Sequence, residues 1–356
     1  MKSSLYVHLP FCRQICPYCD FCRQVYQEKT VDEYLTVLIE DIPEGDFNSI
    51  YLGGGTPSCL NQKQLVRLLS ILQNRTTGEY CIEANVEDVN EGLLKLLKEY
   101  GVNRLSLGVQ SFNDELLNFC QRSYNGKQAV KAIELTKEYF DNFSLDFIYG
   151  FQGFPWEIHE YDIKQAIALG APHISLYALT IEKTSIWGRL RRKTMADDEV
   201  TREQYDKAVD LLKAGYQHYE ISNFAKAGYQ AQTNLVYWHY QDYYGRGLGA
   251  CGKEKNWRYE YTHNMTEYLA NKTLIEDLTL SKEEMMFEYL MMNFRLAEGV
   301  NIKEFAERFG FSFRDCYKAA LAKNKKCLLV NGDNIAINPD YWFVSNHIIK
   351  DFLFTD

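Results

Sequence analysis

The sequence has no apolar run that approaches the roughly 18 residues of a membrane-spanning helix. It also has no excess of basic residues: 39 Lys and Arg stand against 48 Asp and Glu, for a formal net charge of −9. This balance argues against a broad electropositive surface for nucleic acid. The opening residues MKSSLYVHLPFC are too few and too polar for a secretory signal peptide, so we expect a cytoplasmic protein.

Internal repeats and low-complexity tracts are absent as well, which argues against a repeat array. The composition of the 356 residues, 46% hydrophobic and 24% charged, is that of an ordinary globular protein. The length leaves room for one large domain and a smaller one.

Ten cysteines stand out, because a cytoplasmic protein rarely contains structural disulfides. Six of them occur singly and are expected to be packed or free thiols: Cys59, Cys81, Cys120, Cys251, Cys316 and Cys327. The other four lie in the stretch CRQICPYCDFC, at Cys12, Cys16, Cys19 and Cys22. This density predicts a metal site in a loop near the N-terminus.

Zinc and a ferredoxin-type cluster are two alternatives for this loop. A structural zinc site usually combines two separated ligand pairs, and no second cysteine pair or HxxxH follows. A two-cluster ferredoxin needs a second cysteine run, which is also missing. The remaining pattern, C-x3-C-x2-C at Cys12, Cys16 and Cys19, lets one tight loop place three thiolates on three corners of a [4Fe–4S] cubane. The fourth iron then keeps an open position for a substrate, as a catalytic zinc does.

Cys22 allows two interpretations. It is either a fourth cluster ligand in a resting state or a thiol beside the cluster. We favour the second, because three ligands leave one iron free for chemistry. The choice decides between a passive electron carrier and a site that binds a ligand on iron.

Short apolar runs alternate with segments of helical apolar spacing over the first half of the chain. The expected strands are residues 4–9, 49–54, 79–85, 104–110, 143–150 and 173–179. Several of the helical segments between them end at a glycine, a usual helix stop. The alternation predicts an α/β fold with a parallel sheet and outer helices, either as an open sheet or as a partial barrel.

The pattern changes after about residue 200, and we expect three parts. Residues 1–225 form the strand–helix part with the cysteine loop, and residues 226–275 form an irregular connection rich in Tyr and Gly. Residues 276–356 form a C-terminal helical domain with a β-hairpin across NGDN, similar to a winged helix.

Polar and glycine residues gather where the expected strands end. The second strand runs into GGGTP, the third ends at Glu83 and Asn85, the fourth ends at Gln110, and the fifth contains Asp146. The carboxyl ends of parallel strands are where such folds place their chemistry. GGGTP is not a phosphate-binding loop, since no GK[ST] follows it.

The CxxxCxxC loop resembles that of the radical S-adenosylmethionine (SAM) superfamily. Other motifs are similar to those of its coproporphyrinogen-oxidase-like branch: YVHLPFC, CPYCDF, LGGGTPS, EAN, LSLGVQSF, DFIYG, SLYALTIE, YEISNFA and FRLAEGV. Within that branch, CPYCDF and YEISNFA are most similar to the HemW heme chaperones. The resemblance implies a partial (β/α)6 radical SAM barrel and a [4Fe–4S] cluster whose open iron chelates SAM. An electron from the cluster would then cleave SAM to a 5′-deoxyadenosyl radical.

The resemblance also implies a set of SAM contacts. They are Tyr6 and Tyr18, which should contact SAM or shield the cluster, and Gly54, Gly55, Thr56, Glu83, Gln110, Arg122 and Asp146. The backbone amides of residues 54–56 should receive the amino-acid moiety, because glycines permit close approach. Arg122 suits the carboxylate, with which a guanidinium forms a charge-assisted fork. Glu83 and Gln110 suit the ammonium and ribose hydroxyl groups, and Asp146 suits ribose or adenine.

The porphyrin-side motifs depart from the family. HemW proteins carry HNxxYW, proposed to bind heme, and here the stretch reads TNLVYW, with Thr233 in place of the histidine. A threonine hydroxyl is a poor axial ligand for heme iron, so heme would need another ligand, for which Tyr237 and His239 are nearby candidates. The stretch CQRSY keeps Arg122 and has Tyr124 where the family usually has histidine.

Two functions of different class follow. One is a HemW-like chaperone that binds SAM and heme and passes heme to a heme-accepting protein. The other is a radical SAM enzyme for an unidentified, tetrapyrrole-like substrate. Coproporphyrinogen III oxidase activity is not expected, because the CxxCxC spacing and the additional N-terminal segment of that enzyme are missing. An electron donor is expected as a partner, nucleic acid is not, and contact with a membrane surface stays open.

Overall fold

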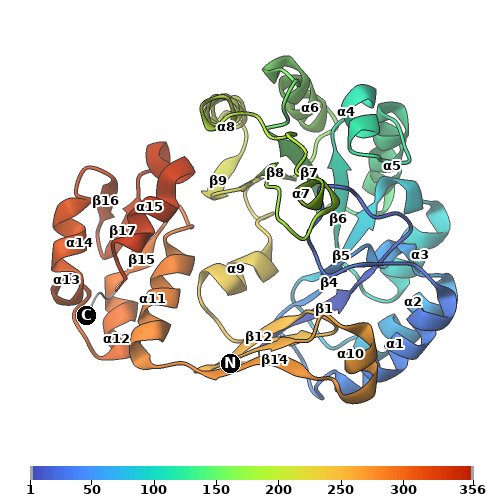
Figure 1. Ribbon diagram of the computed structural model, residues 1–356, viewed down its shortest axis with the longest axis horizontal. Coiled ribbons are helices and arrows are strands. Elements are labelled where there is room, and N and C mark those ends of the chain that lie inside the picture. Colours follow the sequence, from blue (N-terminus) through green and yellow to red (C-terminus); the bar gives the residue numbers. More distant parts are fainter. Residues whose placement is uncertain (1–2, 354–356) are drawn as a thin grey trace.

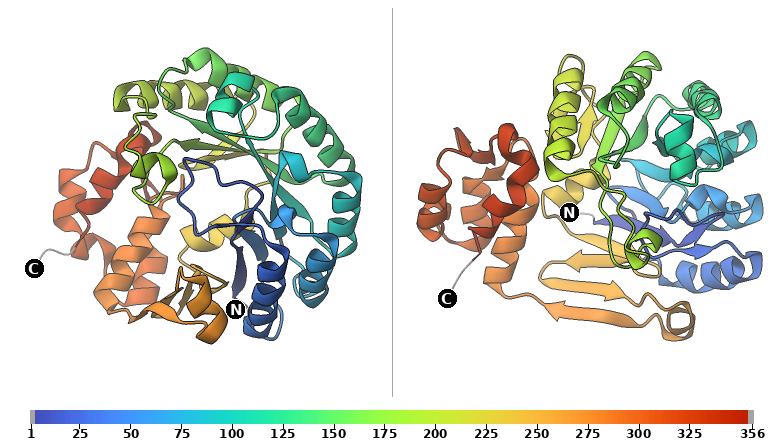
Figure 2. Two further views of the ribbon diagram at one scale, coloured as in Figure 1. Left: turned by 45° about the vertical axis from the view of Figure 1, so that its right-hand side comes forward. Right: turned by 45° about the horizontal axis from the view of Figure 1, so that its top comes forward.

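One twelve-stranded sheet dominates the computed structural model, which describes residues 3–353. Six strands are parallel neighbours in sequence order: β1 (Ser4–Leu9), β4 (Ile50–Gly54), β5 (Tyr80–Asn85), β6 (Arg104–Gln110), β7 (Phe143–Tyr149) and β8 (His173–Ala178). They curve into a partial barrel with helices on its outer face (Figure 1; Figure 2). The predicted α/β fold is therefore confirmed, as a partial barrel rather than an open sheet.

Six helices return the chain across the outer face of the sheet: α1 (Glu28–Asp41), α2 (Gln62–Leu72), α3 (Glu91–Glu99), α4 (Asp114–Phe119), α5 (Gly126–Tyr139) and α6 (Trp156–Ala168). Four of these helices begin at an asparagine whose side chain accepts from the backbone amide three residues on. The apolar faces of the helices pack on the sheet in one continuous core.

Strand alternation separates this core from the inner face of the barrel. In β1, Leu5, Val7 and Leu9 are fully buried in the core, whereas Tyr6 and His8 point inward and line a cavity. The cysteine loop follows directly after β1. Its two ends are joined by the short parallel strands β2 (Phe11–Cys12) and β3 (Gln24–Val25). The loop thus lies at the carboxyl end of the barrel strands, where such folds place their chemistry.

The segment 226–275, which we predicted to be irregular, contains regular strands, so this prediction was wrong. The strands are β11 (Tyr243–Arg246), parallel to β1, and the antiparallel β12 (Cys251–Glu254), β13 (Trp257–Tyr261) and β14 (Leu274–Thr279). Helices α9 (Gln232–Trp238) and α10 (Met265–Asn271) belong to the same segment. The sequence lacked an apolar alternation here because the inward faces of β11–β13 line a cavity with tyrosines and charged residues instead of a core.

Two antiparallel strands form the opposite edge of the sheet. Strand β10 (Asn223–Ala225) pairs with β8, and β9 (Gln217–Glu220) pairs with β10. Between β8 and β9 the chain forms α7 (Ile186–Arg189) and α8 (Asp198–Leu212). Of these, α7 lies next to the cysteine loop, where the Trp187 amide donates to the Pro17 carbonyl at 2.9 Å.

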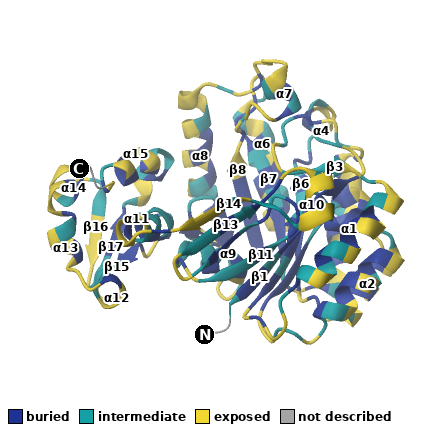
Figure 3. Ribbon diagram, turned by 60° about the horizontal axis from the view of Figure 1, so that its bottom comes forward, coloured by how far each residue is buried: buried dark blue, intermediate teal, exposed yellow. Residues whose placement is uncertain are grey.

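The C-terminal part has a hydrophobic core of its own. Its helices are α11 (Lys282–Asn293), α12 (Ile302–Phe309), α13 (Phe313–Cys316), α14 (Lys318–Lys323) and α15 (Ser345–Lys350). Strands β16 (Leu328–Asn331) and β17 (Asn334–Ile337) form the predicted hairpin across NGDN, and β15 (Val300–Asn301) pairs with β17. Figure 3 shows this part beside the barrel, whose strands are mostly buried. Within residues 3–353, no helix is long and apolar enough to cross a membrane.

Candidate functional site

Backbone hydrogen bonds hold the cysteine loop against the end of β4. The Gly55 amide donates to the Leu9 carbonyl at 2.9 Å, and the Thr56 amide donates to the Phe11 carbonyl at 2.7 Å. A Cβ atom on Gly55 would lie 2.7 Å from that Phe11 carbonyl oxygen, so the close approach requires glycine. The GGGTP turn therefore supports the loop that carries the cysteines.

The four thiols of the loop face two directions. Burial raises the pKa of the Cys19 thiol to about 11, and the nearby Cys16 and Cys12 thiols contribute to the rise. Cys12 also interacts with Cys16. Cys22 interacts instead with Arg23 and Glu260 and lines a cavity on the inner face of the barrel. The structure thus brings the three predicted metal ligands together and turns Cys22 away from them.

Arg122, in the turn after α4, lies beside the loop. Its Nη1 donates to the Cys16 sulfur at 3.0 Å, and its Nη2 donates to Asn85 Oδ1 at 2.8 Å. The side chain is 5% exposed, and its Nε has no hydrogen-bond partner among the described residues. A buried guanidinium with a free donor suits an anionic ligand such as the SAM carboxylate.

Glu83, near the end of β5, points to the inner face of the barrel. The Tyr51 hydroxyl donates to its Oε1 at 2.7 Å, and the Gly54 amide donates to its Oε2 at 3.0 Å. Burial raises the pKa of Glu83 to about 7, and the Asp146 carboxylate contributes to the rise. Each oxygen retains a second lone pair, so Glu83 can still accept from an ammonium or a ribose hydroxyl.

The amides of residues 54–56 all donate within the protein. Gly54 donates to Glu83, and the other two donate to carbonyls at the end of β1 and at the start of the loop. An ammonium is itself a donor and needs an acceptor, so the SAM amino group would suit the Glu83 carboxylate better than these amides. Contact between residues 54–56 and SAM stays a prediction, and the observed role of their amides is to support the loop.

Gln110 and Asp146 lie on the neighbouring strands β6 and β7. Gln110 has a φ of 62°, which is uncommon for a residue other than glycine and is often found at binding sites. Asp146 accepts from the Ser106 hydroxyl at 2.8 Å and from the Ser144 hydroxyl at 2.9 Å, and burial raises its pKa. Asp146 is thus already well supplied with donors, and its contact with ribose or adenine stays a prediction.

The two predicted tyrosines lie in different surroundings. Tyr18 packs on Trp187 with ring centroids 6.0 Å apart, and it is partly buried beside Cys16. This position agrees with a role in shielding a cluster. Tyr6 lies on the inner face, where its hydroxyl is 2.9 Å from His8 Nδ1 and its ring lines the cavity.

That cavity has a volume of about 550 Å³ and opens beside the cysteine loop. Its aromatic walls come from the loop, α9 and the strands: Tyr6, Phe21, Tyr237, Trp238, Tyr240 and Tyr243. It also contains the thiols of Cys22 and Cys251 and the imidazole of His263. Its two cations are already paired, Lys253 with Asp242 at 2.7 Å and Arg258 with Glu288 at 2.9 Å. The cavity therefore suits a large flat ligand better than a small anion.

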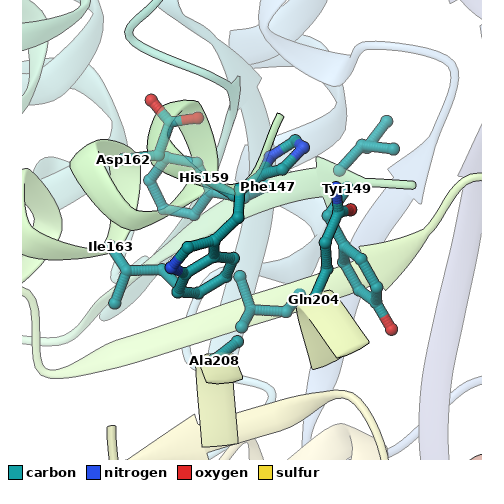
Figure 4. A pocket seen from close by; sticks show the side chains of 10 residues that line it. Phe147, Tyr149, His159, Asp162, Ile163, Gln204 and Ala208 are labelled. Atoms are coloured by element: carbon teal, nitrogen blue, oxygen red, sulfur yellow. The ribbon is translucent and has the colours of Figure 1, made fainter. Parts of the chain in front are cut away.

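A second cavity, of about 10 Å³, lies between β7, α6 and α8 (Figure 4). Its walls are mainly apolar, with Phe147 and Ile163 among them, and it has room for about one water molecule. Asp162 on its border accepts from the Ser111 hydroxyl at 2.7 Å and from the Phe112 amide at 2.6 Å. Asp162 thus holds the turn after β6, and the cavity beside it is too small for a ligand.

Comparison with known proteins agrees with this geometry. Residues 6–166 match the radical SAM superfamily, and residues 280–339 match the HemN C-terminal domain. The heme chaperone HemW of Lactococcus lactis is 32% identical over 371 residues, which cover 99% of this chain and 98% of that protein. HemW of Escherichia coli is also 32% identical, over 97% of this chain and 94% of its own. The chain belongs to the HemW family.

Among solved structures, coproporphyrinogen III oxidase (HemN) from Escherichia coli superposes on this HemW-family chain with a TM-score of 0.85. The match covers 99% of this chain and 90% of that chain at 20% sequence identity. At this identity the likeness shows the shared fold. It confirms the predicted radical SAM barrel together with its C-terminal helical domain.

Radical SAM proteins, and the HemW family with them, hold a [4Fe–4S] cluster and SAM, and the residues present fit both. Cys12, Cys16 and Cys19 are neighbouring thiols, and Arg122 offers the unpaired Nε described above. No group of three or more His, Cys, Asp or Glu within residues 3–353 is arranged for a single metal ion. A cubane does not need such a group, because each of its cysteine thiolates binds a different iron. A bound cluster would supply the electron with which radical SAM chemistry cleaves SAM.

The HemW motif histidine is replaced here by Thr233, and the structure gives this residue a different role. Thr233 is 1% exposed, and its hydroxyl and amide donate to Glu79 Oε1 at 3.0 and 3.1 Å. Thr233 therefore ties the start of α9 to Glu79, and it is not part of the cavity lining. Tyr237 of the same motif lines the cavity, whereas His239 lies 3.5 Å from Glu298 and is not part of the cavity lining.

Sequence reasoning assigned no role to four residues of this HemW-family site. Asn85 bonds to Arg122, and Trp187 covers the loop. Cys251 and Arg258 face the cavity from β12 and β13. Asn85 carried a signal, because it ends a predicted strand within the EAN motif. The other three carried none, because only tertiary contacts bring them to the site.

Proposed function

We propose that this protein is a HemW-type chaperone, which holds a [4Fe–4S] cluster and SAM at the cysteine loop and heme in the adjoining cavity. The observation that supports heme binding is the aromatic cavity of about 550 Å³. Sites for small molecules usually measure about 300–1,000 Å³, and aromatic walls suit a flat macrocycle. An electron donor and a heme-accepting protein are the partners that this function requires.

Cys251, at the start of β12, is the heme-iron ligand that we propose. Its thiol interacts with three tyrosines of the cavity, Tyr6, Tyr237 and Tyr243. Burial raises the pKa of the free thiol to about 11, but coordination to iron displaces the thiol proton. Cysteine is a usual axial ligand of heme, and the threonine at position 233 is not.

Titration of the cluster-loaded protein with hemin tests this function. We expect a Soret band shifted from that of free hemin and, after reduction and addition of CO, the spectrum of a thiolate-ligated heme. Cys251→Ser should lose that spectrum, whereas Cys316→Ser, a matched change in the C-terminal part, should keep it. Absence of a shifted band in the wild-type protein would overturn heme binding. A thiolate spectrum that persists in Cys251→Ser would move the ligand to Cys22.

Radical SAM catalysis on a molecule in the same cavity is a second candidate function. It is favoured by a shared wall, because Phe21 and Cys22 belong both to the cysteine loop and to the cavity lining. A bound molecule would therefore lie next to the loop that holds the cluster. Formation of 5′-deoxyadenosine from SAM should be measured with and without a tetrapyrrole. Acceleration by the tetrapyrrole would favour the enzyme, and an unchanged rate would favour the chaperone.

A further inference from the structure

Two of the three cluster cysteines are joined by a continuous line of hydrogen bonds. Arg122 donates directly to the Cys16 sulfur at 3.0 Å through Nη1 and to Asn85 Oδ1 at 2.8 Å through Nη2. Asn85 Nδ2 donates to Thr56 Oγ1 at 3.1 Å, and the Thr56 hydroxyl donates to the Cys12 sulfur at 3.5 Å. One cation is thus connected to two sulfurs, to one directly and to the other through two neutral side chains.

The direction of donation in this line is fixed by chemistry. A guanidinium has no acceptor, so Asn85 has to present its oxygen to Arg122 and its amide group to Thr56. The Thr56 oxygen accepts from Asn85, and its hydroxyl proton then points to Cys12. Every donor along the line therefore points toward a sulfur, and hydrogen bonds in such a chain strengthen one another.

The surroundings of this line increase its effect. Thr56 is 5% exposed, and the Arg122 side chain is also 5% exposed, so water screens these contacts poorly. Hydrogen bonds to the sulfurs are one of the factors that set the reduction potential of an iron–sulfur cluster. Residues that orient metal ligands from behind typically change metal affinity or activity by about 10- to 100-fold when they are replaced.

We propose that Thr56 and Asn85 are positioning residues that extend the charge of Arg122 to Cys12, so that one guanidinium stabilises two corners of the cluster and raises its reduction potential. The inference depends on the cluster part of the proposed function and is independent of heme. Loss of Thr56 removes the donor to Cys12, and loss of Asn85 disconnects that donor from Arg122. Both changes leave the direct contact between Arg122 and Cys16. The reduced cluster carries more negative charge on its sulfurs, so loss of a donor makes reduction harder.

Thr56→Val tests the proposal, because it keeps the shape of the side chain and removes its hydroxyl. After anaerobic reconstitution, a mediated redox titration followed by EPR should give a more negative midpoint potential than that of the wild type. Iron should also be lost to a chelator about tenfold faster. Thr56→Ser, which keeps the hydroxyl, should restore both values. Thr136→Val, the same change at a buried threonine of α5, should leave both unchanged.

Asn85→Leu should shift both values in the same direction as Thr56→Val but by less, because the Thr56 hydroxyl remains. The double variant should add little to Thr56→Val, because both changes interrupt one line. A wild-type potential and a wild-type chelation rate in Thr56→Val would overturn the proposal. If neither variant assembles a cluster, the wild-type protein still decides. Its reduced cluster should show coupling to an exchangeable proton, identified because the coupling disappears after transfer to D2O. Absence of that coupling would also overturn the proposal. Failure of the wild type to assemble any cluster would instead refute the cluster part of the proposed function.

Discussion

Single residues decide which chemistry the cysteine loop can perform. Cys12, Cys16 and Cys19 interact with one another, whereas Cys22 turns toward the inner cavity, and its backbone carbonyl lies 2.7 Å from His8 Nε2. A loop with three grouped thiols leaves one iron open for SAM. The spacing of the cysteines and the resemblance to radical SAM proteins together predicted this division, and the structure adds the direction in which Cys22 points.

Cys22→Ala should therefore differ from changes at the three grouped cysteines. We expect Cys22→Ala to assemble a cluster whose EPR spectrum still changes when SAM is added. Cys19→Ala should lose the cluster, because one corner of the cubane then lacks its thiolate. Iron and sulfide content together with EPR measure both outcomes. Loss of the cluster in Cys22→Ala to the same degree would show that Cys22 is a ligand.

Glu83 should make SAM binding depend on pH. Burial raises the pKa of this carboxyl to about 7, and only the ionised form attracts the SAM ammonium. As pH falls from 7 to 5.5, most Glu83 becomes protonated, and the affinity for SAM should fall by about tenfold. The amino group of free SAM, with an ordinary pKa of about 8, is protonated over this range, so a proton that it releases on binding iron affects the wild type and Glu83→Gln alike.

Equilibrium binding of SAM to the cluster-loaded protein at several pH values measures this effect. Glu83→Gln keeps the shape of the side chain without a titrating group, so its affinity should be lower at pH 7 and should fall less steeply than that of the wild type down to pH 5.5. A profile in Glu83→Gln as steep as that of the wild type would assign the titration to another group.

Secondary-structure elements show where prediction from sequence succeeds and where it fails. The six barrel strands were found because their buried faces are apolar and β-branched, as in IYLGG (Ile50–Gly54) and HISLYA (His173–Ala178). Strands β12 and β13 were missed because Cys251, Lys253 and Arg258 point into a cavity and break the apolar alternation. The apolar pattern of a sequence thus predicts a strand that is buried in a core, and it does not detect a strand that faces a ligand site.

Helix α9 depends on a residue far away in the sequence. Glu79 accepts from the amides of Gln232 and Thr233 at the start of α9 and lies 3.6 Å from buried Arg104. Glu79→Ala leaves both the helix amides and the guanidinium without this carboxylate, which should cost about 3–5 kcal/mol in the free energy of unfolding. Because α9 carries Tyr237, hemin binding should weaken as well.

Urea unfolding and hemin titration measure the two effects. Glu91→Ala is the matched control, since Glu91 forms an exposed pair with Lys95 and its loss should change the free energy of unfolding little. A Glu79→Ala protein as stable as this control would show that α9 keeps its start by other contacts.

At the scale of the whole molecule, aromatic contacts join the C-terminal part to the barrel, between Phe343 and Tyr205 and between Trp342 and His218. Trp342 of the C-terminal part is 1% exposed, and its ring lies 4.4 Å from the ring of His218 in β9 of the barrel sheet. Its Nε1 also donates to the Ile337 carbonyl at 3.1 Å. The sequence predicted a separate C-terminal domain from its helical pattern, but the partners in this contact depend on packing between distant segments. The boundaries at residues 225 and 275 remain our proposal.

Trp342→Ala should destabilise the C-terminal core by about 3–5 kcal/mol, as removal of a buried aromatic ring usually does. We expect calorimetry to show an early transition for this part, while the barrel keeps its SAM-responsive cluster until a higher temperature. Leu329→Ala, at a side chain that is 47% exposed, is the control and should change little. One shared transition at a lower temperature would show that the two cores unfold together.

The cysteine loop lies between the proposed cluster site and the larger cavity, and this position has a consequence for binding experiments. The loop that carries the three proposed iron ligands also supplies Phe21 and Cys22 to the wall of the larger cavity. In a preparation that has lost its iron to air, the loop that forms one wall of this cavity is therefore no longer held by the cluster. Aerobic and anaerobic preparations of the same protein should therefore differ in their affinity for hemin, and the iron content should be given with each measured affinity.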